Sequence, residues 1–71
     1  MKKVKVNTNY IKVLRKNKNI SIEKMSFLMG YKGYQAYYYK ENGIRKMSAE
    51  DIAMISQILE IPMKELYVYF D

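Results

Sequence analysis

The sequence predicts an all-α fold, a compact bundle of five short helices. Three observations support this prediction: apolar residues recur at helical spacing in short stretches, capping residues precede these stretches, and glycines or other turn-forming residues follow them. The connections between the stretches are short. Because the chain has 71 residues and no cysteine, we expect one domain over residues 1–71 that packing holds together without disulfide bonds.

The first part of the chain is expected to form an arm and one helix. Residues 1–8 are interpreted as an N-terminal arm, because the strand-like alternation at residues 4–6 is too short to form a strand without a partner. Polar residues at 7–9 supply N-cap candidates for a helix over about residues 9–16. The side chains expected to face the core are Ile11 and Leu14. Those expected to face solvent are Lys12, Arg15 and Lys16.

Two short helices are expected to meet around Gly30. Ser21 is the N-cap of the first of them. The apolar stripe of this helix consists of Ile22, Met25 and Met29. Gly30 ends the helix, because the left-handed conformation at a helix C-terminus favours glycine. Residues 31–42 are expected to form a lead-in turn and a third helix, which Gly43 ends.

The last two helices are expected after Ser48 and Pro62. Ser48, followed three residues later by Asp51, is close to a capping box in which Asp replaces Glu or Gln. The buried stripe of the fourth helix consists of Ile52, Ile55 and Leu59. Pro62 suits the first turn of a fifth helix over about residues 63–69. The side chains expected to be buried there are Leu66 and Phe70.

The helices joined at Gly30 have the ingredients of a helix-turn-helix. Small residues are needed where such helices cross, and the chain offers Ser26, Gly33 and Ala36. At about 100° per residue, the third helix directs toward the core Gly33, Ala36, Tyr37 and Lys40. Its other face, which is large and polar, consists of Gln35, Tyr38, Tyr39 and Asn42. Glutamine can bind adenine through two hydrogen bonds in the major groove, and tyrosine can contact a thymine methyl group or a phosphate.

The charge of the chain indicates a polyanion as its partner. There are 13 Lys and Arg residues against 7 Asp and Glu residues, for a net charge of +6. The net charge is +7 over residues 1–19, +3 over residues 20–46 and −4 over residues 47–71. Such a chain can present a basic face to the polyanion and keep an acidic face away from it. Solvated lysines without a partner would have the same composition, and this alternative stays open.

Composition also bears on catalysis, metal binding and membrane insertion. Histidine and cysteine are absent, and no nucleophile–base pair or glycine-rich phosphate loop is visible. We therefore expect no enzymatic activity, no metal, no cofactor and no small-molecule ligand. No apolar run approaches the roughly 20 residues that span a bilayer, and no export signal is visible. We therefore expect a cytoplasmic protein without a membrane partner.

A series of motifs covers residues 9–70. They are Ile11-x-x-Leu14-Arg15, the run NISIEKMSFLMG at 19–30, Tyr37, Glu41-Asn42-Gly43, Ser48-Ala49-Glu50-Asp51-Ile52, Ile55-Ser56-x-x-Leu59-x-Ile61 and Lys64-Glu65-Leu66. Together these motifs resemble the Cro/repressor-type (XRE-like) helix-turn-helix family of phages and bacteria. The resemblance implies a lambda-repressor-like fold. It also implies a sequence-specific regulator of transcription, a phage or prophage repressor that binds a double-stranded DNA operator as a homodimer, with its third helix in the major groove.

The resemblance and the predicted faces together assign the contacts to DNA. Base contacts are expected from Tyr34, Gln35, Tyr38 and Tyr39. Contacts to the DNA backbone are expected from Asn19, Ser21, Lys32, Asn42, Arg45 and Lys46. The N-terminal lysines, Lys2, Lys3 and Lys5, either reach along the DNA as an arm or belong to a frayed terminus.

Three features depart from the family pattern. The spacing from Gly30 to Gly43 is one residue longer than the commonest one. Ile22 matches a phosphate-contacting slot, yet its side chain cannot bind a phosphate. Ser26 replaces the usual alanine. In addition, Phe27 stands where the family is usually polar, which favours a contact with a partner over a place in the core.

The C-terminal end has more apolar residues than one small core needs, which predicts an isologous dimer contact there. The residues assigned to it are Ile58, Ile61, Met63, Tyr67 and Tyr69. Two other functions stay open: an antitoxin of the same fold that represses its own operon, and a protein-binding helical adaptor such as an antirepressor, with Phe27 and the tyrosines as anchors. The adaptor predicts binding that hardly responds to salt, whereas the affinity for DNA falls steeply with salt.

Overall fold

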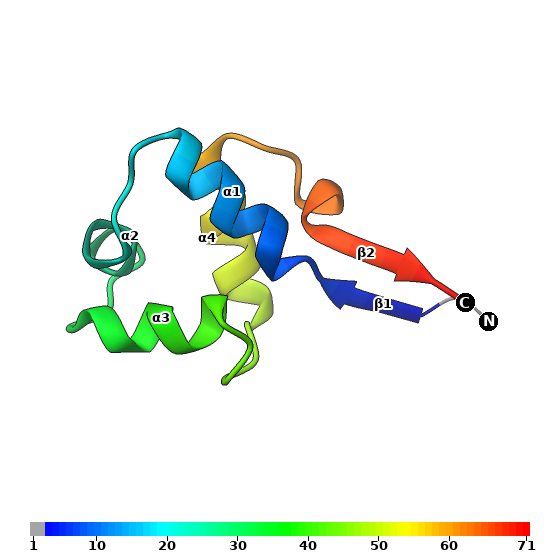
Figure 1. The fold of residues 1–71 in the computed structure, drawn as a ribbon, viewed down its shortest axis with the longest axis horizontal. Helices are drawn as coiled ribbons and strands as arrows, with labels where there is room; N and C mark the ends of the chain where they lie inside the picture. Colours follow the sequence, from blue (N-terminus) through cyan, green and yellow to red (C-terminus); the bar gives the residue numbers. More distant parts are fainter. Residues whose placement is uncertain (1–2) are drawn as a thin grey trace.

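The computed structural model describes residues 3–71, and within this range it has four α-helices, a short 3₁₀-helix and a two-stranded antiparallel sheet (Figure 1). In chain order the elements are β1 (Lys3–Val6), α1 (Thr8–Asn17), α2 (Ile22–Leu28), α3 (Tyr34–Glu41), α4 (Ala49–Leu59), η1 (Met63–Leu66) and β2 (Tyr67–Phe70). The sheet projects from one end of the helical body, so the molecule measures 38 × 22 × 18 Å. No helix of residues 3–71 is long and apolar enough to cross a membrane.

All four α-helices and η1 contribute to one apolar core. The buried apolar side chains are Ile11, Met25, Met29, Tyr37, Ile52, Ile55, Leu59 and Leu66. Each of these residues is predicted to be buried from its helical spacing, so the core is confirmed. Fully burying such a side chain contributes about 1.5–3 kcal/mol. Leu14 and Ile22 are half-buried and pack against this core.

Side-chain caps begin three of the helices, as the sequence predicts. Asn7 Oδ1 accepts a hydrogen bond from a backbone N–H at the start of α1, and Ser21 Oγ does the same for α2. In the capping box of α4, Ser48 Oγ accepts a hydrogen bond from the Asp51 backbone N–H at 3.0 Å. The Asp51 carboxylate accepts one from the Ser48 backbone N–H at 2.8 Å. Asp therefore serves in a position where Glu or Gln is more usual.

Glycine allows the chain to turn after α2 and after α3. Gly30 has φ +83° and Gly43 has φ +76°. Both values lie in the left-handed region, where residues with a Cβ are disfavoured. The predicted ends of the second and third helices are confirmed at these two positions.

The prediction of a fifth helix over residues 63–69 is wrong. Only Met63–Leu66 is helical, as the 3₁₀-helix η1, and Tyr67–Phe70 forms strand β2. The aromatic and β-branched side chains of residues 67–70 favour a strand once a partner strand is available. Phe70 pairs with Lys3 and is 44% exposed, so its predicted burial is also wrong.

The predicted N-terminal arm is wrong for residues 3–8, while residues 1 and 2 lie outside the described residues. Residues 3–6 form β1, which pairs with β2 in the register Lys3↔Phe70 to Val6↔Tyr67. The backbone N–H of Asn7 then donates to Leu66 O at 2.8 Å, and Thr8 is already part of α1. The alternating segment thus has the partner strand that the sequence did not reveal.

Candidate nucleic-acid interface

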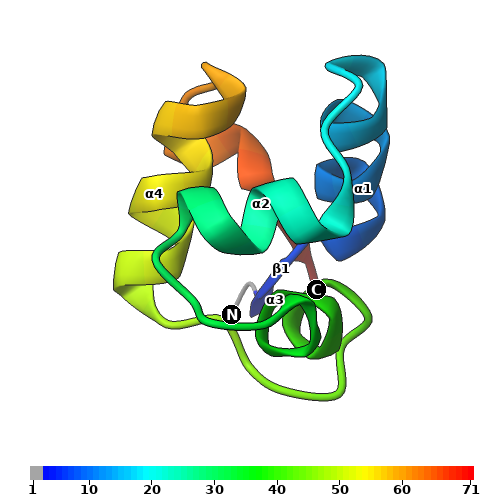
Figure 2. The ribbon, with the colours of Figure 1, turned by 90° about the vertical axis from the view of Figure 1, so that its left-hand side faces the viewer.

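Helix α3 crosses α2 (Figure 2), and the two are joined through a small buried residue. Ser26 is 1% exposed, and its Oγ donates a hydrogen bond to Gly33 O at 2.5 Å. The predicted small contact is confirmed. The serine in place of alanine gains a polar role, because its hydroxyl fixes the turn that leads into α3.

The other end of α3 is tied to α1 by a buried ion pair. Arg15 Nε lies 2.8 Å from Glu41 Oε2, and Arg15 Nη2 lies 3.0 Å from Glu41 Oε1. Arg15 Nη1 also donates to Ile20 O at 2.5 Å. The prediction that Arg15 faces solvent is wrong, because its side chain is needed to compensate a buried carboxylate. Burial, followed by the neighbouring Glu41 carboxylate, raises the pKa of the Tyr37 hydroxyl, which keeps this core side chain neutral.

A third tie joins α3 to α4. Lys40 Nζ donates to Asp51 Oδ2 at 2.5 Å and to Tyr31 Oη at 2.8 Å, and the Tyr31 hydroxyl donates to Asp51. Burial opposes the charged forms of Asp51 and Lys40. Their hydrogen bonds outweigh it, lowering the pKa of Asp51 to about 2 and raising the pKa of Lys40. Burial and the bond to Asp51 raise the pKa of Tyr31. The charge of Lys40 is therefore compensated within the protein.

These three contacts hold α3 in place, and the face of the helix that takes no part in them is open to solvent. Tyr34 is 51% exposed, Tyr38 is 42% exposed, and Gln35 is also exposed. The Tyr34 and Tyr38 rings pack edge to face with centroids 6.4 Å apart, and the Tyr38 and Tyr39 rings do so at 6.0 Å. The structure thus brings the four residues predicted to contact bases together on one rigid helix. Tyr39 is half-buried, and the Arg45 guanidinium lies 5.5 Å from its ring centroid.

The six residues predicted to contact the DNA backbone lie in the connections between the four α-helices. All six are exposed. Asn19, with φ +58°, and the N-cap Ser21 lie between α1 and α2, and Lys32 lies between α2 and α3. Asn42 is the C-cap of α3, and the loop after it holds Arg45 and Lys46.

Two cations of α1 belong to the same surface, although the sequence does not single them out as site residues. Lys12 and Lys16 line a groove of about 270 Å³ between α1 and α3, together with Tyr38 and Asn42. Lys12 Nζ donates to Asn42 Oδ1 at 3.3 Å, and Asn42 Nδ2 donates to Tyr38 O at 2.8 Å. Asn42 therefore holds Lys12 beside the exposed face of α3. Lys12 and Lys16 are four positions apart on a helix that contains no acidic residue, and this pattern is the signal in the sequence that indicates a basic helix face.

Phe27 lies apart from the core, on the exposed side of α2. Its side chain is 70% exposed, and Lys24 Nζ lies 5.6 Å from its ring centroid. It lines a shallow groove with Tyr31, Lys32 and Tyr34, at the N-terminal end of α3. The expectation that Phe27 is not a core residue is confirmed, and its partner stays a prediction.

Comparison with known proteins agrees with this geometry. The family model of the Cro/C1-type HTH DNA-binding domain matches residues 10–71. No curated protein and no solved structure matched the chain in the same comparison. The family match covers α1 from Tyr10 onward, the α2–α3 pair with its exposed polar face, α4 and the C-terminal segment. The chain therefore belongs to the Cro/C1-type helix-turn-helix family and is a DNA-binding domain.

Proposed function

We propose that the protein is a cytoplasmic transcriptional repressor of the phage or prophage type that binds a double-stranded operator as a homodimer. The observation that carries this proposal is the exposed face of α3. It is uncharged and rich in hydrogen-bonding groups, and Lys12, Lys16, Arg45 and Lys46 flank it. The proposal assigns no catalytic activity to the chain.

The chemistry of this face suits direct readout of the major groove. The amide of Gln35 supplies a donor and an acceptor, the pair that matches an adenine edge. The tyrosine rings offer apolar edges to thymine methyl groups and hydroxyls to phosphates. The flanking cations attach to the backbone on either side and set the register of the helix in the groove.

A dimer is part of the proposal because a single short helix reads few base pairs. Two copies related by a two-fold axis read two half-sites about 34 Å apart. The proposed contact is assigned to the C-terminal end, where Met63 is 50% exposed and Tyr69 is 57% exposed, and where Ile58, Ile61 and Tyr67 are half-buried. Sedimentation should show a dimer in the presence of operator DNA. A monomer at high micromolar concentration, with and without DNA, would contradict it.

The direct test is a binding titration on the DNA upstream of the protein's own gene, with a scrambled duplex as control. We expect the natural sequence to be preferred, and log affinity to fall with log salt by about 0.9 for each phosphate neutralised. Equal affinity for both duplexes, or binding that does not respond to salt, would contradict the proposal. The second result would favour a protein partner instead.

A further inference from the structure

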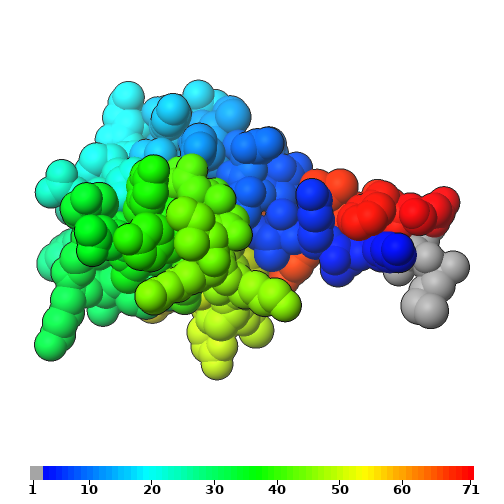
Figure 3. Space-filling view, turned by 60° about the horizontal axis from the view of Figure 1, so that its bottom comes forward, coloured from blue at the N-terminus to red at the C-terminus, as the bar shows by residue number. Residues whose placement is uncertain are grey.

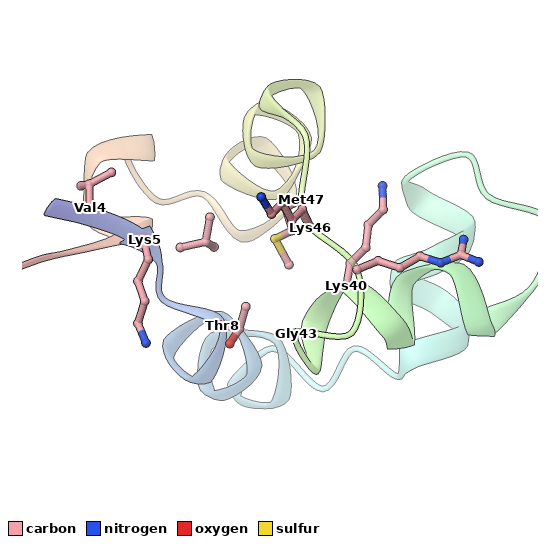
Figure 4. A pocket seen from close by; sticks show the side chains of 9 residues that line it. Val4, Lys5, Thr8, Lys40, Gly43, Lys46 and Met47 are labelled. Carbon is pink, nitrogen blue, oxygen red and sulfur yellow. The ribbon is translucent and has the colours of Figure 1, made fainter.

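A second basic groove lies beyond the C-terminal end of α3, between β1 and the loop that joins α3 to α4 (Figure 4). Its volume is about 450 Å³. Val6, Thr8 and Met47 form part of its lining, to which β1 adds Lys5 and the loop adds Arg45 and Lys46. Figure 3 shows α3, this loop and β1 along one face of the molecule.

The groove carries uncompensated positive charge. Its lining residues include four cations and no carboxylate. Of these cations, Lys40 forms an ion pair with Asp51, while Lys5, Arg45 and Lys46 take part in none of the ion pairs found among residues 3–71. A hollow with three such cations and an apolar lining favours an anion that has an apolar part.

Both walls of the groove are held in place before any ligand binds. On one side, Val6 is packed against the core, and Asn7 N–H donates to Leu66 O. On the other side, the backbone N–H groups of Ile44 and Arg45 donate to Tyr39 O at 2.8 and 3.1 Å. The loop wall is therefore a direct continuation of α3. Little ordering free energy has to be spent when a ligand enters a site of this kind.

We propose that this groove binds the sugar-phosphate backbone of the operator, beyond the phosphates that flank α3. Lys5 is the phosphate ligand supplied by β1, and Lys46 is the one supplied by the loop. Deoxyribose contacts the apolar lining at Val6 and Met47. DNA is favoured over an acidic protein segment because Arg45 lines the groove and also lies over the ring of Tyr39 on α3, so one DNA strand can run along both surfaces. This inference rests on the proposed function.

The test compares two duplexes that share one operator. The short duplex ends where the half-sites end, and the long duplex extends about half a helical turn further on each side. We expect Lys5→Gln to bind the long duplex about fivefold more weakly per subunit at 0.15 M salt and to lower the salt slope by about 0.9 per subunit. On the short duplex it should equal the wild type. Lys64→Gln is the matched control, since it removes the same charge from η1, which lies across the molecule from α3.

Three outcomes would overturn this inference and leave the proposed function standing, and a fourth would overturn both. If Lys5→Gln equals the wild type on both duplexes, with an unchanged salt slope, the groove does not bind DNA, yet operator recognition by α3 still stands. An equal loss on both duplexes would mean that Lys5 contacts DNA inside the half-sites and not beyond them, which contradicts the inference. Binding of a poly-glutamate peptide at least as tight as that of the long duplex, and equally weakened by Lys5→Gln, would assign the groove to a protein. If even the wild type does not prefer the operator over scrambled DNA, the proposed function fails as well.

Discussion

Arg15 on α1 and Glu41 at the end of α3 form a bidentate ion pair, with side chains that are only 7% and 0% exposed. Removing Glu41 by substitution to Ala leaves the guanidinium charge buried without its partner. Breaking a buried pair in this way typically costs about 3–5 kcal/mol. We expect a loss of this size in the free energy of unfolding, measured by urea denaturation. A loss under about 1 kcal/mol would contradict the structural role of the pair.

A double variant tests whether this loss comes from the unpaired buried charge and not from lost packing. Arg15→Met combined with Glu41→Leu removes both charges and keeps much of the volume, so we expect it to recover more than half of the single variant's loss. Lys18→Ala is the control, because Lys18 and Glu60 form an exposed pair. It should change stability by no more than about 1 kcal/mol.

The network of Tyr31, Lys40 and Asp51 predicts how stability depends on pH. The pKa of Asp51 is lowered from its usual 3.8 to about 2. Because the folded-state pKa lies below the unfolded one, the carboxylate stabilises the fold above about pH 4, and this contribution is lost as the pH falls toward 2. It amounts to about 2 kcal/mol. The raised pKa values of Lys40 and Tyr31 add stability that is complete below about pH 10 and is lost as the pH rises further.

Urea midpoints measured from pH 2 to pH 11 check this prediction. Asp51→Asn should be less stable than the wild type at pH 7 and should show a shallower decline below pH 4. If the two proteins decline in parallel in acid, the low pKa of Asp51 is not what links stability to pH.

Gln35 and Arg45 are predicted to affect DNA binding in different ways. Gln35→Ala removes a base-reading amide and should relax the preference at one base position by about 1–3 kcal/mol. Arg45→Ala removes a backbone contact and should weaken binding to all sequences alike, with a lower salt slope. Binding to a library of operator variants measures both effects. An unchanged base preference in Gln35→Ala would mean that α3 does not lie in the groove as proposed.

Phe27 is predicted to be needed neither for the fold nor for operator binding. Since the ring is 70% exposed, Phe27→Ser should change the free energy of unfolding by no more than about 0.5 kcal/mol. Operator affinity should also persist if α3 carries recognition. An operator complex that forms normally in the wild type and is lost in a stable Phe27→Ser protein would instead make this ring part of the DNA-binding surface.

The helices around the core could be predicted from the sequence because local signals agree there. Caps at Ser21 and Ser48, glycines at 30 and 43 and apolar stripes at helical spacing all indicate the same elements. The burial of Tyr37 and the exposure of Gln35 follow from the same periodicity. The buried and exposed sides of the third helix could therefore be predicted from the sequence.

The sheet could not be predicted, because it depends on two segments more than 60 positions apart. Residues 3–6 and 67–70 are each too short to be strands alone, and only the fold brings them into register. The burial of Arg15 could not be predicted for a related reason. Its partner Glu41 is 26 positions away, and no local pattern indicates that an arginine is buried to neutralise a distant carboxylate. The groove between β1 and the α3–α4 loop depends on the same long-range pairing.

The central claim is that the exposed face of α3 meets the DNA. Amide chemical shifts of the labelled protein, recorded during titration with an operator duplex, test it most directly. We predict the largest changes at Tyr34, Gln35, Tyr38 and Tyr39 and in the loop through Lys46, with little change along the buried side of α4. Changes concentrated on α4 and η1, with the amides of α3 unmoved, would contradict it.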